Sequence, residues 1–240
     1  MKTQQWNYTE GNSNLIGYIA NEETIPGQKP VVMVCHAFEG CSQLMHEHAE
    51  KLAQMGYIGF AIDMYGDGIV ETTFDECVNQ FMRFNKDRGF LQKRIQAAFA
   101  TAKALPQANS QKIAAIGFCF GGMCVLDLAR SGADINGVVS IHGVFKQPEG
   151  LKDHKITAKV LALHGYDDPQ TSPEQIKDFM EEMERKSADW QFHFFSHTKH
   201  AFTDPNAEKL GPPEMGRVYN GVSTKQTWDY IKSFLEEVFK

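Results

Sequence analysis

One cysteine lies in a glycine-rich turn between an apolar run and a helical pattern. The segment 117–122 (GFCFGG) follows Ile113–Ile116 and leads into Phe120–Arg130, which places Cys119 in a G-x-C-x-G motif. A strand, a tight turn and a helix at this spacing are the context of a nucleophile elbow, here with cysteine instead of serine. Glycines two residues on either side remove side chains that would collide in the turn, and a helix N-terminus favours a thiolate. The alternative is a buried structural cysteine.

A thiol nucleophile needs a base, and the base needs a group that orients it. In this type of site the nucleophile, the acid and the histidine follow each other in that order along the chain. Asp168, in the loop after one late predicted strand, is the candidate acid, and His200, after the next strand, is the candidate base. Asp167 and His197 remain open as competitors.

Acyl transfer also needs donors for the developing oxyanion. The backbone N–H of Phe120, directly after the cysteine, is one candidate, and the loop 36–40 (HAFEG) is expected to supply the other. His36, at the start of this loop, is interpreted as a hydrogen-bonded support rather than a catalytic base. The residues for acyl transfer are thus present in three separate loops.

Short β-rich apolar runs alternate with amphipathic stretches, which predicts a mostly parallel sheet flanked by helices on both faces. Ligand sites in such sheets lie at the carboxyl ends of the strands. The predicted strands are Val31–Cys35, Ile58–Ile62, Ile113–Ile116, Gly137–Ile141, Val160–His164 and Trp190–Phe195. The predicted helices are Gln43–Met55, a long one within Phe74–Leu105, Phe120–Arg130, Pro173–Lys186 and Thr224–Phe239. An N-terminal hairpin is expected to join the first core strand through the polar loop Asn21–Pro30.

Composition narrows the class of protein. The chain has 240 residues, of which 42% are hydrophobic, and we expect one α/β domain over 1–240. The formal charge of −6 without a basic run argues against a nucleic-acid partner. Five cysteines at irregular spacing suggest reduced thiols, and no apolar stretch approaches the roughly 20 residues that span a bilayer. We therefore expect a cytoplasmic protein without a membrane partner, and its state as a monomer or homodimer stays open.

Taken together, these motifs resemble the dienelactone hydrolase family of α/β-hydrolases. The resemblance rests on the loop 36–40, on 56–57 (GY) leading to 63–66 (DMYG), on 117–122, on 164–165 (HG) with Asp168, and on 199–202 (KHAF). It implies an α/β-hydrolase fold and a carboxylic ester or lactone hydrolase with Cys119 as nucleophile, His200 as base and Asp168 as acid. By the same resemblance Phe38 gives the second oxyanion N–H, and no cofactor or metal is implied.

The chain departs from the family pattern at positions that bind substrate. The family usually carries a glutamate where this chain has Ala37; Glu39 is a possible substitute that holds the resting thiol, or else a loop or pocket residue. Family members that cleave dienelactone bind its carboxylate with arginines, and those positions correspond here to Asp204 and to the region of Asp75 and Glu76. Acidic residues repel an anionic substrate, so we expect neutral small-molecule esters or lactones. Alternatives are a thioesterase or phosphotriesterase on the same triad, and a redox-sensing thiol protein.

Other features receive structural interpretations. His46 and His48 are two residues apart on a predicted helix and face away from each other, which argues against a shared metal ion. His142 and His164, at strand ends, are expected to be packed and hydrogen-bonded. The segment Asp67–Asp87 is expected to cover the site as a partial lid.

Overall fold

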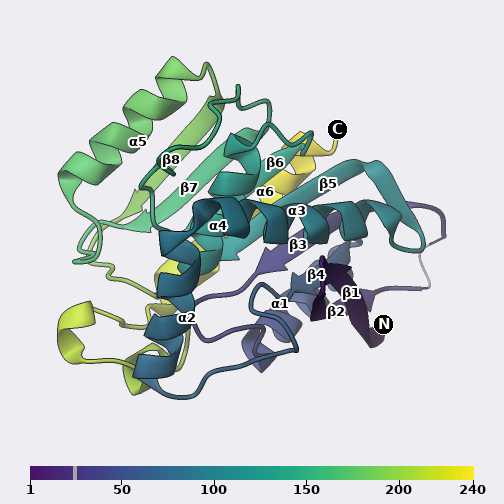
Figure 1. Cartoon of the computed structure of the whole chain (residues 1–240), viewed down its shortest axis with the longest axis horizontal. Coiled ribbons are helices and arrows are strands. Elements are labelled where there is room, and N and C mark those ends of the chain that lie inside the picture. Colours follow the sequence, from purple (N-terminus) through teal and green to yellow (C-terminus); the bar gives the residue numbers. More distant parts are fainter. Residues whose placement is uncertain (24–25) are drawn as a thin grey trace.

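A computed structural model of the chain describes residues 1–23 and 26–240. Its centre is an eight-stranded sheet with the order β1-β2-β4-β3-β5-β6-β7-β8 (Figure 1). The pairs β1–β2 and β2–β4 are antiparallel, and the remaining pairs are parallel. The predicted mostly parallel α/β fold and the N-terminal hairpin are therefore confirmed. Within the predicted loop Asn21–Pro30, residues 24–25 lie outside the described residues.

The helices and strands have the following bounds. The strands are β1 Lys2–Glu10, β2 Ser13–Asn21, β3 Lys29–Cys35, β4 Ile58–Ile62, β5 Ala108–Phe118, β6 Gly137–Ile141, β7 Lys159–Gly165 and β8 Asp189–Phe195. The α-helices are α1 Gln43–Gln54, α2 Phe74–Lys86, α3 Arg88–Ala104, α4 Phe120–Arg130, α5 Pro173–Arg185 and α6 Gly221–Val238. Two short 3₁₀ turns, Ala207–Lys209 and Pro213–Met215, precede α6.

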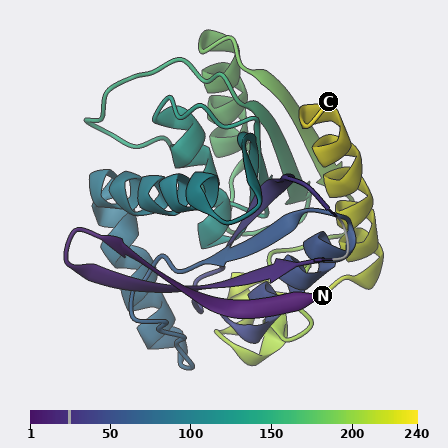
Figure 2. The ribbon, with the colours of Figure 1, turned by 90° about the vertical axis from the view of Figure 1, so that its right-hand side faces the viewer.

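Helices cover both faces of the sheet. Figure 2 shows α1 and α6 on one face, whereas α2, α3, α4 and α5 lie on the other. Each face has its own apolar core: Trp228 and Leu235 of α6 pack with Leu52 of α1, while Ile95 of α3 packs with Met123 of α4. Because side chains alternate along a strand, the central strands contribute residues to both cores. Their sequences are therefore continuous apolar runs.

All six predicted strands are present, but the long predicted helix within Phe74–Leu105 is wrong: the structure has two helices there. Asp87 ends α2 and begins α3, and its backbone leaves the helical region with φ −122° and ψ 83°. Its carboxylate accepts a hydrogen bond from the backbone N–H of Phe90 at 2.8 Å, which is a typical N-cap contact. Aspartate competes for backbone donors in this way, so it favours the start of a new helix over continuation.

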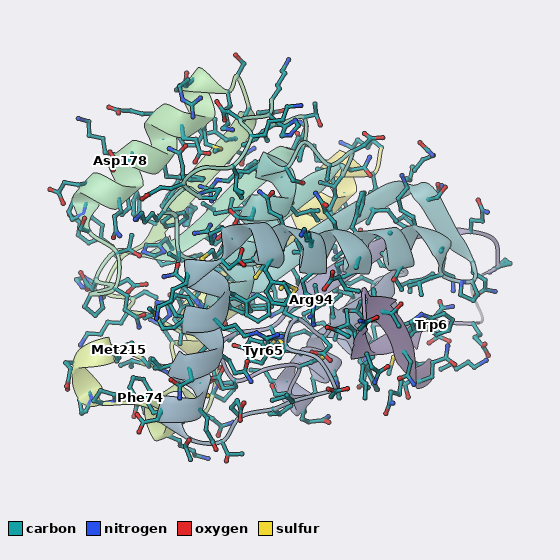
Figure 3. The ribbon with its side chains drawn as sticks, viewed as in Figure 1. Trp6, Tyr65, Phe74, Arg94, Asp178 and Met215 are labelled. Carbon is teal, nitrogen blue, oxygen red and sulfur yellow. The ribbon has the colours of Figure 1, made fainter. Side chains whose placement is uncertain are left out.

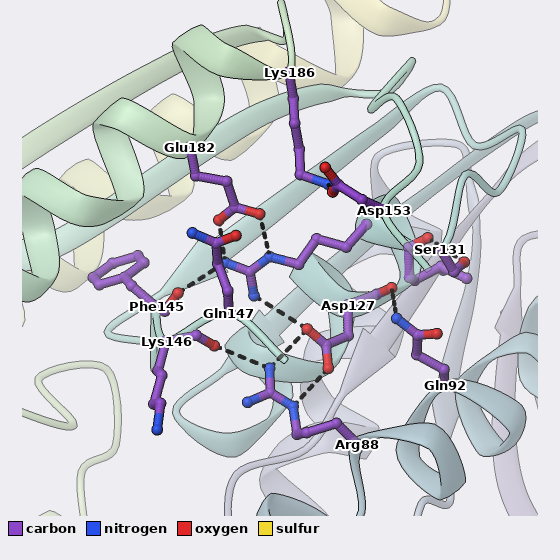
Figure 4. Close-up of polar contacts among 12 residues, drawn as sticks. Arg88, Gln92, Asp127, Ser131, Phe145, Lys146, Gln147, Asp153, Glu182 and Lys186 are labelled. Atoms are coloured by element: carbon purple, nitrogen blue, oxygen red, sulfur yellow. Dashed lines mark hydrogen bonds and ion pairs between the residues drawn. The ribbon is translucent and has the colours of Figure 1, made fainter. Parts of the chain in front are cut away.

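A buried ionic network holds the helix that follows the cysteine turn (Figure 4). Asp127 of α4 accepts two hydrogen bonds from Arg88 of α3, both at 2.7 Å, and one from Arg130 at 3.1 Å. Arg130 in turn donates to both carboxylate oxygens of Glu182 of α5. The network therefore fixes α3, α4 and α5 relative to one another, and with them the N-terminal end of α4.

The loop after β4 is also held by a buried charged residue. The carboxylate of Asp63 accepts hydrogen bonds from four backbone N–H groups, among them those of Tyr65 and Gly66. Arg94 of α3 donates to the backbone oxygen of Met64 in the same loop, and Figure 3 shows Arg94 and Tyr65 in the interior. The Tyr65 hydroxyl then donates to the backbone oxygen of Phe38 at 2.8 Å, which links this loop to 36–40.

Candidate active site

Cys119 occupies the sharp turn between β5 and α4. Its backbone has φ 53° and ψ −111°, a strained conformation for a residue that is not glycine. A Cβ on Gly117 would lie 2.1 Å from the backbone oxygen of Gly121, and a Cβ on Gly121 would lie 2.1 Å from that of Cys35. Both distances are far below van der Waals contact, so the two glycines are required by the close approach of the backbone. This is the geometry expected from the G-x-C-x-G motif.

The structure brings Cys119, His200 and Asp168 together at the carboxyl ends of β5, β8 and β7. His200 Nε2 lies 3.2 Å from Cys119 Sγ, and His200 Nδ1 lies 2.7 Å from Asp168 Oδ2. All three residues are buried, with Cys119 the most exposed at 8%. The other carboxylate oxygen of Asp168 accepts the backbone N–H of Gln170 at 2.8 Å. A thiol, an imidazole and a carboxylate are thus linked in the order that nucleophilic catalysis needs.

The two residues left open by the sequence lie elsewhere. Asp167 and His197 face each other on the surface, with Asp167 Oδ2 3.9 Å from His197 Nδ1. The His197 side chain is 96% exposed. Neither is part of the contacts around Cys119.

The charges of the site raise the pKa of His200. Burial lowers this pKa, but the Cys119 sulfur and the Asp168 carboxylate outweigh it and raise the pKa to about 10. For Asp168, burial raises the pKa, but the contacts with His200 outweigh it and leave it below the usual value. The contacts of His200 therefore favour the protonated form of its imidazole.

Phe38 and Phe120 are the two residues whose backbone N–H groups are expected to bind an oxyanion. Phe120 is the first residue of α4, so its N–H has no acceptor within the helix. Phe38 lies in the loop that Tyr65 fixes, and its ring packs edge-on against Phe74 at the start of α2. His36 supports this loop: its Nδ1 lies 2.6 Å from the backbone oxygen of Ala37, and its Nε2 accepts the N–H of Met64.

A cavity of about 390 Å³ lies next to the cysteine turn and the His200 loop. Phe118 and Ala201, the chain neighbours of Cys119 and His200, form part of its wall. Apolar side chains also line it, and they include Leu44, Met45, Val70 and Leu210. Val70, Glu71 and Thr72 belong to the segment Asp67–Asp87, so the start of that segment forms part of the wall. The cavity can hold a small organic ester.

An arginine that the sequence analysis overlooked lies in this cavity. Arg217 Nη2 lies 2.6 Å from Glu39 Oε1 and 3.4 Å from Asp204 Oδ2, and its guanidinium stacks on the Phe38 ring at 4.5 Å. Its side chain is only 4% exposed, against 20% for Glu39 and 19% for Asp204. Burial raises the pKa of Glu39, although Arg217 opposes this effect. Arg217 is the only arginine after His200 in the sequence, which is the signal that could have pointed to it.

Asp75, Glu76, His46 and His48, which the sequence analysis also considered, lie in the following places. Glu76 caps α2 through Thr73, and neither Glu76 nor Asp75 lines the cavity. His46 stacks on Tyr18, and His48 stacks on Phe118. Within residues 1–23 and 26–240, no group of three or more metal-binding side chains is arranged to hold an ion.

His142 and His164, both at strand ends, also differ from each other. His142 forms hydrogen bonds through both ring nitrogens, as expected. His164 packs on Phe145, and its Nε2 lies 3.5 Å from Asp168 Oδ2, at the limit of a hydrogen bond. The expectation of hydrogen bonds is therefore met at His142 only.

Comparison with known proteins decides the family. A model of the dienelactone hydrolase family matches residues 15–239. The chain belongs to the dienelactone hydrolase family. Members of this family are hydrolases, and this chain is a hydrolase.

Individual relatives agree with this assignment. A solved structure of a dienelactone hydrolase-like promiscuous phosphotriesterase from metagenomic libraries is 33% identical, with a TM-score of 0.94 over 100% of this chain and 99% of that one. An uncharacterized protein of Caenorhabditis elegans is 36% identical over 155 residues, which are 63% of this chain and 96% of the relative. A carboxymethylenebutenolidase of Pseudomonas sp. is 27% identical over 177 residues, 59% of this chain and 73% of the relative. In the part of the chain that the structure describes, no helix combines the length and apolar character of a membrane span.

Proposed function

We propose that this dienelactone hydrolase family member cleaves carboxylic esters or lactones through a Cys119–His200–Asp168 triad and an acyl-thioester intermediate. The observation that carries the proposal is the unbroken line of contacts from Cys119 Sγ to His200 at 3.2 Å and from His200 to Asp168 at 2.7 Å. These contacts are buried and lie beside a cavity of suitable size. The proposal covers one site for a small-molecule substrate.

The reaction follows from the protonation state of the pair. The Cys119 sulfur, having given its proton to His200, attacks the carbonyl carbon, and the N–H groups of Phe38 and Phe120 stabilise the oxyanion. The tetrahedral intermediate collapses, the C–O bond breaks, and His200 transfers its proton to the departing alkoxide. A water molecule then attacks the thioester while His200 takes its proton, and the acid leaves as the thiolate is restored. Asp168 holds His200 in the orientation that each step needs.

The charges in the cavity favour neutral substrates. Arg217 is covered by its pairs with Glu39 and Asp204, so these carboxylates are more exposed to the cavity than the guanidinium. An anionic substrate would have to displace one of them. Glu39 thereby acts as a pocket residue that occupies the arginine, rather than as a partner of the resting thiol, which contacts His200.

A neutral phosphotriester is a second candidate substrate. The relative that is 33% identical over the whole chain is a promiscuous phosphotriesterase. The same thiolate and the same oxyanion donors would serve attack on phosphorus. This activity and ester hydrolysis share one site and can be measured on one set of variants.

The test is hydrolysis of p-nitrophenyl butyrate and of diethyl p-nitrophenyl phosphate by the wild type, Cys119→Ala and His200→Ala. We expect both variants to lose at least about 10³-fold in kcat/KM, because nucleophile and base act as a unit. His197→Ala, a fully exposed histidine three residues from His200, is the matched control and should retain wild-type activity. Mass spectrometry should find an acyl group on the peptide that contains Cys119.

Other outcomes separate the alternatives. Unchanged turnover in Cys119→Ala or His200→Ala would exclude the triad. Oxidation of Cys119 by peroxide that does not depend on His200, with no ester turnover, would support a redox-sensing thiol instead. Comparison of p-nitrophenyl butyrate with its hemisuccinate analogue tests the charge argument, since the carboxylate should lower kcat/KM by about tenfold.

A further inference from the structure

His142, at the carboxyl end of β6, bonds to two segments that carry different members of the triad. The backbone N–H of Cys119 is shared between His142 Nδ1 at 3.1 Å and the backbone oxygen of Ile141 at 3.0 Å. His142 Nε2 lies 2.9 Å from the hydroxyl oxygen of Thr203, three residues after His200. One imidazole thus connects the turn that presents the sulfur to the loop that presents the base.

The two bonds define the protonation of this ring. Because Nδ1 accepts a hydrogen bond, the proton of the neutral ring lies on Nε2, which donates to the Thr203 oxygen. A second proton on Nδ1 would face the N–H of Cys119 and break that contact. Three ionisable groups influence the pKa of His142, namely His200, His164 and Arg217. Burial, followed by the positive charge of His200, places the pKa of His142 well below its usual value, in agreement with a neutral ring.

The backbone around His142 is strained in the same way as the cysteine turn. His142 has φ 39°, and Cys119, which it faces, has φ 53°. Neither residue is glycine, and such conformations cost of order 1–3 kcal/mol each and persist where the surroundings over-determine them. The next residue, Gly143, lies so close to α4 that a Cβ on it would be 3.0 Å from the Cα of Gly122. The contacts therefore hold two strained residues against each other at the site.

We propose that His142 is a positioning residue that sets the separation between Cys119 Sγ and His200 Nε2. The inference rests on the proposed function, because this separation matters only if the two atoms exchange a proton. His142 holds the cysteine turn from the main chain and the base loop through Thr203, and it also forms part of the cavity wall. Loss of either bond lets the two segments move apart without removing a member of the triad.

The sharpest variant is Thr203→Val, which removes one hydroxyl and keeps the size of the side chain. We expect kcat for p-nitrophenyl butyrate to fall about tenfold with KM changed less than twofold, and the alkylation rate of Cys119 by iodoacetamide to fall by a similar factor. His142→Phe, which removes both bonds and keeps a planar ring, should lose about 10²-fold, since small displacements of reacting groups have effects of this size. Thr227→Val is the matched control: Thr227 is buried in α6 and its hydroxyl has no partner among the described residues, so both rates should stay at wild-type values.

Alkylation is quantified by mass spectrometry on the Cys119 peptide, and circular dichroism identifies variants that fail to fold. Nitrogen-15 NMR of the wild-type histidines at pH 7 should show His142 neutral with its proton on Nε2. Folded Thr203→Val and His142→Phe with both rates within twofold of wild type would overturn the proposal, as would an Nδ1-protonated His142. If wild type hydrolyses no ester, the proposed function fails, while alkylation and NMR still decide the role of His142.

Discussion

Replacing Asp168 by asparagine removes a negative charge from the site and keeps the size of the side chain. Asp168 Oδ2 contacts His200 Nδ1 at 2.7 Å, and both side chains are buried. An asparagine can present either its oxygen or its amide nitrogen to Nδ1. If the amide donates to Nδ1, the ring proton lies on Nε2 and His200 cannot accept a proton from Cys119.

The size of the effect follows from the pKa of His200. Its rise from an ordinary 6.5 to about 10 corresponds to about 5 kcal/mol in favour of the protonated ring. Cys119 stands ahead of Asp168 among the groups that raise this pKa, so the carboxylate supplies the smaller part of the effect. The unfavourable tautomer adds to this loss. We expect kcat/KM to fall about 10²- to 10³-fold, or ~3–4 kcal/mol in transition-state stabilisation.

Two measurements check this expectation. Hydrolysis of p-nitrophenyl butyrate gives kcat/KM, and iodoacetamide alkylation of Cys119 from pH 5 to 10 gives the reactivity of the sulfur directly. Asp167→Asn is the matched control, because Asp167 is the adjacent carboxylate and faces solvent and His197. The reasoning fails if folded Asp168→Asn keeps more than a tenth of wild-type kcat/KM. It also fails if Asp167→Asn loses as much kcat/KM as Asp168→Asn does, because Asp168 would then not be what orients His200 for catalysis.

Two further predictions concern stability. Asp127→Asn should lower the free energy of unfolding by about 3–5 kcal/mol, because it leaves the buried Arg88 without its counter-charge, whereas Asp229→Asn on the surface should change it by less than 1 kcal/mol; urea denaturation measures both. Burial lowers the pKa of His48 to about 3, so below pH 6.5 the unfolded chain binds a proton that the folded chain does not, and stability is lost as the pH falls. Between pH 7 and pH 5 this costs about 2 kcal/mol, and a His48→Phe variant that unfolds with the same pH dependence as wild type would contradict the assignment.

The sequence predicted the parts of the site that depend on local pattern. The strands are short apolar runs whose carboxyl ends are marked by turn residues, so Cys119, Asp168 and His200 could each be placed at a strand end before the structure was known. The break at Asp87 escaped detection because the amphipathic pattern continues on both sides of it, and only the cap contact with Phe90 shows where one helix ends.

Arg217 could not be predicted for a different reason. Its partner Glu39 is 178 residues away in the sequence, and the two segments meet only when β3 and the chain before α6 come to the same edge of the sheet. No spacing rule connects an arginine to a carboxylate at that distance. The same holds for the bond between His142 and Thr203, which joins residues 61 positions apart. Local motifs therefore located the reactive groups, and the long-range contacts that tune them became visible only in the fold.

His142, His164 and His200 are buried imidazoles near the triad, and their partners decide which of these three is protonated. His200 faces both the Cys119 sulfur and the Asp168 carboxylate, and these two groups outweigh burial and raise its pKa. For His142, burial and the positive charge of His200 both lower the pKa, and its bond from the N–H of Cys119 requires an unprotonated nitrogen. His164 lies near Asp168 at 3.5 Å, yet burial still lowers its pKa to about 4. The surroundings thus raise the pKa of one imidazole and lower the pKa of the other two. We therefore assign proton transfer to His200, whereas His142 holds the backbone and His164 fills the core.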